Sequence, residues 1–128
     1  MKEILSFIIT HGNLADELNK VSQKFLPTEV STYTYSNQKD SIEKIVSDTS
    51  EIIIESKADN IIIFVDLMGG SCWHAAMTLK KNFEKVSIIT GVNIPSLVSF
   101  STNFNKLEWS DLIEKIEVDS KKAIRAIK

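Results

Sequence analysis

The fold is decided by residues 61–71, which read IIIFVDLMGGS. Five consecutive apolar residues, most of them β-branched, are typical of a strand that is buried on both faces, as in a parallel sheet covered by helices. The apolar run ends abruptly at Asp66, and a glycine loop at residues 69–70 leads into a segment of helical period. A strand, a loop and a helix in this order predict one unit of an α/β fold.

Strands and helices are predicted to alternate along the whole chain. Apolar runs predict strands at residues 4–9, 29–35, 61–66 and 86–90, and the second run is polar enough for a sheet edge. Apolar residues at helical spacing predict helices at residues 14–25, 41–57, 71–83, 95–101 and from 110 onward. The triplet Ile52-Ile53-Ile54 is assigned to a helix because it continues the apolar stripe of Ile42 and Ile45.

Prolines and polar residues mark the helix ends. Pro27 is expected to end the first helix, while Asn93 and Pro95 are expected to shape the loop and first turn of the fourth. Ser110, followed by Asp111, is expected to cap the last helix. The apolar residues that this helix is expected to turn inward are Leu112, Ile113, Ile116, Ala123, Ile124 and Ile127.

This alternation predicts the α/β class, with an open, doubly wound sheet of four parallel strands and helices on both faces. Ligands of such sheets bind beyond the carboxyl ends of the strands, where the strand order reverses. An order of 2-1-3-4, which we assume, places the reversal between the first and third strands. His11 and Asp66 directly follow those two strands, so we expect them to share one crevice.

Composition limits the possible classes of protein. A chain of 128 residues, 43% of them hydrophobic, suits a single domain over residues 1–128. A formal charge of −2 without a basic block argues against a nucleic-acid partner. The single cysteine, Cys72, excludes an intramolecular disulfide, and we find neither a signal-peptide pattern nor an apolar run of about 20 residues. We therefore expect a soluble, cytoplasmic protein.

A histidine and a carboxylate at one sheet edge suit nucleophilic chemistry. A free imidazole has a pKa of about 6.5, so it is largely neutral and nucleophilic near pH 7. A bond from Asp66 to one ring nitrogen would fix the tautomer and stabilise the positive charge that develops when the other nitrogen attacks. Gly12 and Gly70 precede helices whose unpaired N–H groups favour anions, and Ser71 adds a hydroxyl. We expect these three residues to bind a phosphoryl group that His11 accepts and returns.

Three separated motifs resemble, in order and spacing, the IIA components of the mannose family of the bacterial phosphoenolpyruvate-dependent sugar phosphotransferase system. They are Thr10-His11-Gly12, residues 64–71 (FVDLMGGS) and residues 89–98 (ITGVNIPSLV). The resemblance spans nearly the whole chain, from Ile4 to the last helix.

The resemblance implies a phosphotransferase with a phosphohistidine intermediate and neither cofactor nor metal. His11 would take a phosphoryl group from the phosphocarrier protein HPr and pass it to a IIB component on another chain, for sugar uptake through membrane IIC and IID components. Asp66 would be bonded to the imidazole, and Ser71 would contact the phosphoryl group. The family also implies a homodimer, with residues 91–98 and the C-terminal segment near the contact and the option of an added antiparallel edge strand there.

The chain departs from the family after Ser71. The family commonly continues with Pro, Phe and Asn, whereas this chain has Cys72, Trp73 and His74. Trp73 and His74 can change which IIB protein docks, and the segment between residues 25 and 40 is shorter than is typical. Apart from the resemblance, residue type and position predict simple structural roles. We expect Cys72 to be a small core residue, His74 to lie on the helix surface or at a dimer contact, and Ser71 to be an N-cap.

Three alternatives use the same residues. In a regulatory protein of this fold, phosphorylation of His11 would signal to another protein. A serine hydrolase would use Ser71 with His11 and Asp66, but the sequence lacks the Gly-x-Ser-x-Gly elbow. A zinc module would use His11, Asp66, Cys72 and His74. Cys72 and His74 are two positions apart on one helix and point about 200° apart, so both can hardly reach one ion. The sequence does not identify the sugar.

Overall fold

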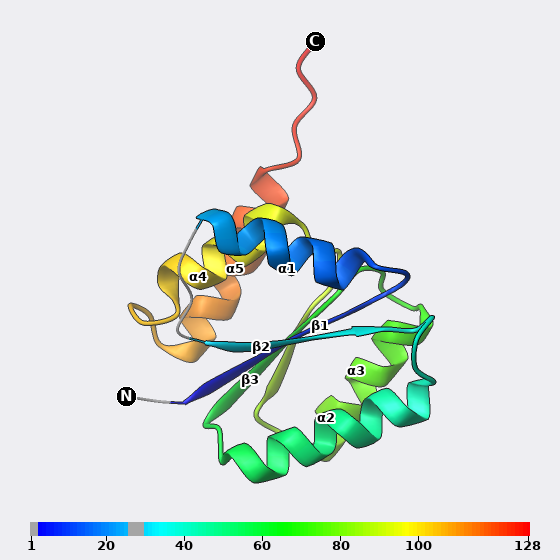
Figure 1. Ribbon diagram of the computed structural model, residues 1–128. Coiled ribbons are helices and arrows are strands. Elements are labelled where there is room, and N and C mark those ends of the chain that lie inside the picture. The colour runs from blue at the N-terminus through cyan, green and yellow to red at the C-terminus, as the bar shows by residue number, and fades with distance from the viewer. Residues whose placement is uncertain (1–2, 26–29) are drawn as a thin grey trace.

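Four parallel strands form one sheet in the order β2-β1-β3-β4 in the computed structural model, which describes residues 3–25 and 30–128 (Figure 1). The predicted α/β class and strand order are confirmed. An added edge strand at a subunit contact stays a prediction. The strands are β1 (Ile4–Thr10), β2 (Ser31–Ser36), β3 (Asn60–Val65) and β4 (Val86–Ile89).

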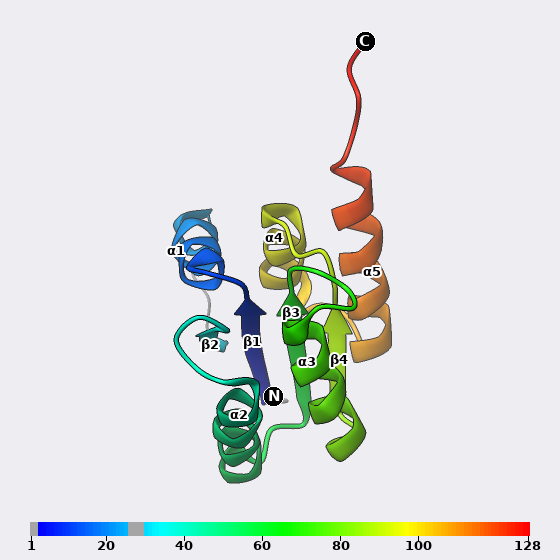
Figure 2. The same ribbon diagram turned by 90° about the vertical axis from the view of Figure 1, so that its right-hand side faces the viewer.

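Helices cover both faces of the sheet, as Figure 2 shows in a view toward the carboxyl ends of the strands. One face carries α1 (Leu14–Phe25), α4 (Ile94–Asn103) and α5 (Trp109–Lys122). The other carries α2 (Ile42–Ser56) and α3 (Ser71–Asn82). Within the described part of the chain, no helix has the length and hydropathy needed to cross a bilayer.

The central strands β1 and β3 are apolar because both of their faces are covered. Successive side chains of a strand point to opposite faces. Phe7 and Ile63 accordingly pack in the core beneath α2 and α3, whereas Ile8 and Phe64 pack in the core beneath α1, α4 and α5. All four are buried. Burial on both sides explains why the two strands read as continuous apolar runs rather than as alternating ones.

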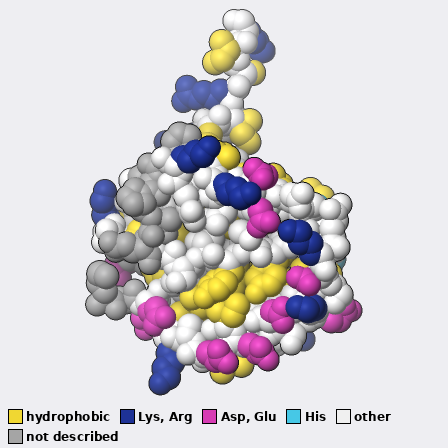
Figure 3. Space-filling model, viewed as in Figure 1, with side chains coloured by type: hydrophobic (Ala, Val, Ile, Leu, Met, Phe, Trp, Pro, Cys, Tyr) yellow, Lys and Arg dark blue, Asp and Glu magenta, His cyan; other side chains and the backbone are white. Residues whose placement is uncertain are grey.

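β2 is an edge strand, as its polar sequence predicts, and pairs only with β1 among the described strands. Tyr33 of β2 stacks on Phe7 of β1 with ring centroids 5.4 Å apart, and Tyr35 is half-buried against the core below. Figure 3 shows the apolar surface that gathers between β2 and α2 on this side of the molecule. Ser31 and Tyr33 are the exposed positions of β2, while Thr32, Thr34 and Tyr35 are partly covered and Ser36 is buried.

Side chains cap the N-termini of both α2 and α4. Ser41 is the N-cap of α2, and its hydroxyl accepts a hydrogen bond from the N–H of Lys44 at 3.1 Å. Residues 52–54 lie within α2, with Ile53 buried, so their assignment to a helix is confirmed. Asn93 caps α4 through a reciprocal pair of bonds with Ser96. The expected stop at Pro27 lies outside the described residues.

The predicted course of the last helix is wrong at both ends. Glu108 rather than Ser110 is the N-cap of α5, and the helix ends at Lys122. Ala123 and the residues after it are exposed, with Ile124 79% and Ile127 91% accessible, and the chain leaves the body of the molecule there (Figure 1). The apolar period continues past Lys122, but a short helical stretch persists only where another surface covers its apolar side.

Candidate functional site

His11 and Asp66 lie side by side at the carboxyl edge of the sheet, where the sequence analysis expects them. They follow the neighbouring strands β1 and β3, which are in register with Ile9 opposite Val65. The ring Nδ1 of His11 is 2.9 Å from Oδ2 of Asp66. An ionised carboxylate only accepts hydrogen bonds, so Nδ1 carries the proton and Nε2 keeps a free lone pair. The pair therefore holds the imidazole in the tautomer that a nucleophile at Nε2 requires.

The backbone adds a second bond to the same carboxylate. The N–H of His11 donates to Asp66 Oδ2 at 3.0 Å, which fixes the start of the loop after β1 as well as the ring. The His11 side chain is 45% exposed, whereas that of Asp66 is only 15% exposed. A partner molecule can thus reach the imidazole while the carboxylate is held beneath it.

The uncapped N-terminus of α3 lies against the imidazole. Gly70 is its N-cap and provides no side-chain bond, and a Cβ added at Gly70 would lie 3.4 Å from Cε1 of His11. The first-turn N–H groups of any α-helix have no carbonyl partner within the helix, and they favour a negative charge. Ser71 is the first residue of α3 rather than its N-cap, so the expected capping role is wrong and its hydroxyl is not used in a cap.

The N-terminus of α1 differs from that of α3. The Thr10 hydroxyl accepts a hydrogen bond from the N–H of Ala15 at 2.7 Å, and Asp16 and Glu17 place negative charge in the first turn. Gly12 makes the turn between β1 and α1 with a φ of +57°, a conformation that disfavours other residues. The two helix starts are therefore unequal, and α3 offers the better anion site.

Asn37 is a site residue that the sequence analysis missed. Its side-chain Nδ2 is 3.4 Å from the Ser71 hydroxyl oxygen, and its backbone N–H donates to the carbonyl of Thr10 at 3.2 Å. By donating to Ser71, Asn37 leaves the hydroxyl proton of Ser71 free to donate elsewhere. The position of Asn37 could have indicated this, because Asn37 directly follows β2 and the carboxyl ends of parallel strands meet at one edge of the sheet.

Cys72 is a core residue, as expected, and it also reaches the site. Its side chain is fully buried, yet Sγ lies 3.9 Å from Nδ1 of His11. Burial raises the pKa of the Cys72 thiol above its usual value, and the negative charge of Asp66 adds to the rise. The ligand atoms of His11, Asp66 and Cys72 all lie within 4.8 Å of one another. They form a set of residues that can hold a metal ion.

Trp73 and His74, which also depart from the family pattern, lie outside this set of three residues. His74 is exposed, whereas Cys72 on the same helix is buried, which agrees with their predicted divergence. The rings of Trp73 and His74 meet edge to face at 5.2 Å. The four-residue zinc module therefore does not form.

The geometry does not favour a serine hydrolase. A serine nucleophile needs a hydrogen bond to its histidine base. Among the described residues, the Ser71 hydroxyl contacts Asn37, and we find no hydrogen bond from it to His11. Ser71 lies in the first turn of α3 after the N-cap Gly70, and the sequence lacks the Gly-x-Ser-x-Gly elbow.

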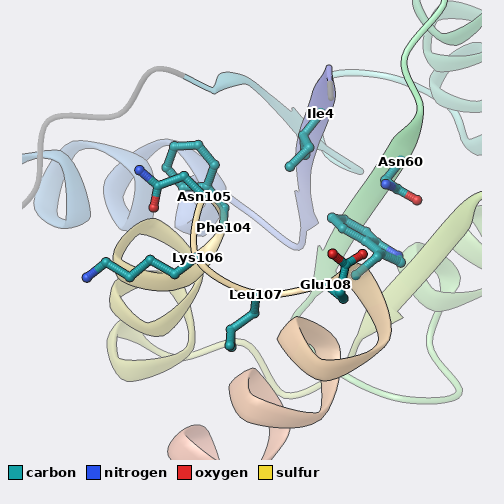
Figure 4. A pocket seen from close by; sticks show the side chains of 8 residues that line it. Ile4, Asn60, Phe104, Asn105, Lys106, Leu107 and Glu108 are labelled. Carbon is teal, nitrogen blue, oxygen red and sulfur yellow. The ribbon is translucent and has the colours of Figure 1, made fainter. Parts of the chain in front are cut away.

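A separate pocket of about 250 Å³ lies at the opposite edge of the sheet, near the first residues of β1 and β3 (Figure 4). The loop between α4 and α5 forms its other side. Its lining lacks the histidine, cysteine and aspartate that meet at the carboxyl edge. The lining residues are Ile4, Asn60, Phe104, Asn105, Lys106, Leu107, Glu108 and Trp109.

Known proteins are similar to this chain in sequence pattern and in fold. The model of the family described as "PTS system fructose IIA component" matches residues 6–117. No curated protein matches.

Solved structures share the fold at low sequence identity. A phosphotransferase system component EIIA from Streptococcus agalactiae has a TM-score of 0.83 and 18% identity over 96% of each chain. A mannose/sorbose specific IIA subunit from Enterococcus faecalis has a TM-score of 0.83 and 18% identity, over 100% of this chain and 96% of the other. A PTS IIA protein associated with the fucose utilization operon of Streptococcus pneumoniae has a TM-score of 0.73 and 20% identity, over 97% and 98%. At these identities the structures show the fold alone.

Proposed function

The chain belongs to the mannose-type IIA family of the sugar phosphotransferase system, and on that premise we propose that His11 carries a phosphoryl group between two partner proteins. The observation that supports this proposal most directly is the 2.9 Å contact between Nδ1 of His11 and Asp66, which leaves Nε2 as the free nucleophile. The exposure of the His11 side chain supports access of both partners to the imidazole.

In the proposed reaction the Nε2 lone pair of His11 attacks the phosphorus of the donor. The bond between phosphorus and the donor atom breaks, and the donor atom keeps the electron pair. The imidazole then carries a positive charge, which the carboxylate of Asp66 stabilises through Nδ1–H. Phosphoryl transfer requires mainly positioning and charge stabilisation, and the second transfer reverses these steps toward the acceptor.

The phosphoryl oxygens are proposed to lie at the start of α3. The N–H groups of its first turn and the Ser71 hydroxyl would donate to them, and Gly70 would allow close approach because it has no side chain. Gly12 is proposed as a further contact from the turn after β1. Each helix N-terminus contributes only about 0.3–1 kcal/mol to an exposed anion, so the positioned hydroxyl and Asp66 matter beside it.

The partners follow from the family. We propose phospho-HPr as the donor, a IIB component as the acceptor, and membrane IIC and IID components as the indirect users of the phosphoryl group for sugar uptake. A homodimer in the cytoplasm, without nucleic acid, completes the proposal. The chain carries a charge of −2 without a basic block, which supports protein partners over nucleic acid.

The donor step is tested by incubating the protein with phosphoenolpyruvate, enzyme I and HPr. We expect an acid-labile, alkali-stable phosphate on His11, none on His11→Gln, and normal labelling of His74→Gln. His74 is the matched control because it is the second of the chain's two histidines and lies outside the site. Labelling of His11→Gln at the wild-type rate would contradict the proposal.

The acceptor step is tested by adding purified IIB protein to the labelled chain. We expect the phosphoryl label to move to IIB in no more time than phospho-HPr takes to label His11. A label that stays on His11 would contradict transport and favour the regulatory alternative.

A further inference from the structure

Three ligand-type side chains from separate elements converge at the site. His11 follows β1, Asp66 follows β3, and Cys72 lies in the first turn of α3. Nδ1 of His11 is 2.9 Å from Oδ2 of Asp66 and 3.9 Å from Sγ of Cys72. In a tetrahedral zinc site with bonds of about 2.0–2.3 Å, ligand atoms lie about 3.3–3.8 Å apart. All three ligand atoms lie within 4.8 Å of one another, so side-chain shifts would bring them to this spacing.

One buried oxygen atom of the site lacks a hydrogen-bond partner within the described part of the chain. Oδ1 of Asp66 is buried and has no hydrogen-bond partner among the described residues. A buried carboxylate oxygen without a partner is costly, and a cation coordinated by Oδ1 would remove that cost, while Oδ2 keeps the bond from the backbone N–H of His11. A carboxylate and a thiolate together carry two negative charges, which match a divalent ion. Thiolate and imidazole ligands favour zinc over magnesium or calcium.

We propose that His11, Asp66 and Cys72 form a three-ligand site for a soft divalent cation such as Zn²⁺, and that an ion bound there prevents His11 from accepting a phosphoryl group. Water would occupy the fourth position on the exposed side of His11. The site differs from the four-residue module considered from the sequence, because the exposed His74 has no part in it.

The inhibition follows from the protonation of the imidazole and rests on the proposed function. Nδ1 must give up its proton to bind the ion, so the neutral ring carries its proton on Nε2 instead. Nε2 then has no free lone pair and cannot attack phosphorus. The Cys72 thiol releases its proton to solvent when it binds. Conversely, a phosphoryl group on Nε2 leaves the proton on Nδ1, so phosphorylation excludes the ion to the same degree.

Cys72 completes the set of three ligands. It occupies the first position at which the sequence departs from the motif of the family it resembles. Asp66 and His11 alone supply two ligands, and the sulfur supplies the third from within the core.

Metal binding is tested without reference to activity. The metal-free chain is titrated with Zn²⁺ by calorimetry and with Cd²⁺ by ultraviolet absorption, because a cadmium–thiolate bond gives a charge-transfer band. We expect one ion per chain and a band in the wild type and in His74→Gln. Cys72→Ala should lose the band and bind Zn²⁺ more weakly by about 10–100-fold or more. Loss of a residue that only hydrogen-bonds to a metal ligand already costs that much affinity.

Retention of wild-type affinity by Cys72→Ala, or the absence of a cadmium band in the wild type, would overturn the site. Circular dichroism checks that Cys72→Ala is folded, and Cys72→Ser provides a second variant that keeps the size of the side chain. We expect it to lose the cadmium band as well.

The inhibition is tested by phosphorylation after chelation and after zinc addition. We expect stoichiometric Zn²⁺ to block labelling of the wild type and a chelator to restore it. For Cys72→Ala we expect the rate in the same zinc to equal the rate of that variant under chelation. Equal inhibition of both proteins would overturn the inference. Failure of the chelated wild type to label would instead contradict the proposed function, while the calorimetric result would stand.

Discussion

His11 donates to one oxygen of Asp66 through both its backbone N–H and its ring Nδ1, although the two residues are 55 positions apart. Two bonds from one residue to one oxygen fix the ring relative to the strand from which it emerges. The imidazole is thus oriented before any partner arrives, which lowers the cost of positioning in the reaction.

Replacing Asp66 by Asn tests this orientation. The amide offers a donor as well as an acceptor, so it no longer fixes the tautomer, and it cannot neutralise the imidazolium. We expect Asp66→Asn to slow phosphorylation of His11 by about a hundredfold or more while the fold persists. The rate of labelling by phospho-HPr and the far-ultraviolet circular dichroism measure the two effects. A rate equal to that of the wild type would remove Asp66 from the mechanism.

Gly70→Ala tests the close approach of α3 to the imidazole. The φ of Gly70 is −82°, which alanine adopts without strain, but its Cβ would lie 3.4 Å from Cε1 of His11. We expect slower labelling together with a loss of stability of about 1 kcal/mol at the N-cap. Ser41→Ala is the matched control, because it removes the N-cap bond of α2 at a similar cost. Equal labelling rates for the two variants would show that crowding at His11 is unimportant.

Asn37 and Ser71 are predicted to act as a pair. Asn37→Ala and Ser71→Ala should each reduce the labelling rate several-fold, and the double variant should be little slower than Ser71→Ala, because Asn37 acts through the Ser71 hydroxyl. The four rates form a double-mutant cycle. Gln38→Ala, at the exposed neighbouring position, controls for disturbance of the loop. Strictly additive effects would disprove the coupling.

Asp119 links α4 and α5 in a pH-dependent way. The Ser99 hydroxyl donates to Asp119 at 2.7 Å and Lys115 lies at 3.0 Å, and these contacts, the first being the larger cause, hold the pKa of Asp119 below its usual value. A lowered folded-state pKa gives stability that is present above the unfolded value of about 3.9 and is lost as pH falls through the folded value.

We therefore expect Asp119→Asn to lower the free energy of unfolding by about 1 kcal/mol near neutral pH, a difference that shrinks in acid. Urea denaturation over a series from about pH 7 to about pH 3 measures it. Glu114→Gln, an exposed change on the same helix, should show little difference at any pH. A deficit for Asp119→Asn that is constant with pH would contradict the assignment.

The sequence predicted the parts of the fold that follow from local pattern and topology. Apolar runs identified β1 and β3, and the continuity of these runs indicated that both faces of the strands are buried. The meeting of His11 with Asp66 followed from the assumed strand order. Asn37 was missed because an asparagine after a strand is also an ordinary turn residue. The end of α5 was wrong because Ile124 keeps the helical period, whereas the packing surface that would sustain it depends on tertiary structure.

The site spans two strands whose adjacency depends on everything between them. β1 and β3 pair directly, yet α1, β2 and α2 come between them in the chain. Pairing of strands so distant in sequence costs loop-closure entropy before the contacts are gained, so it depends on the rest of the sheet and its helices. The ability to carry phosphate should therefore disappear in a single transition with the sheet itself, and neither half of a chain cut between β1 and β3 should retain it alone.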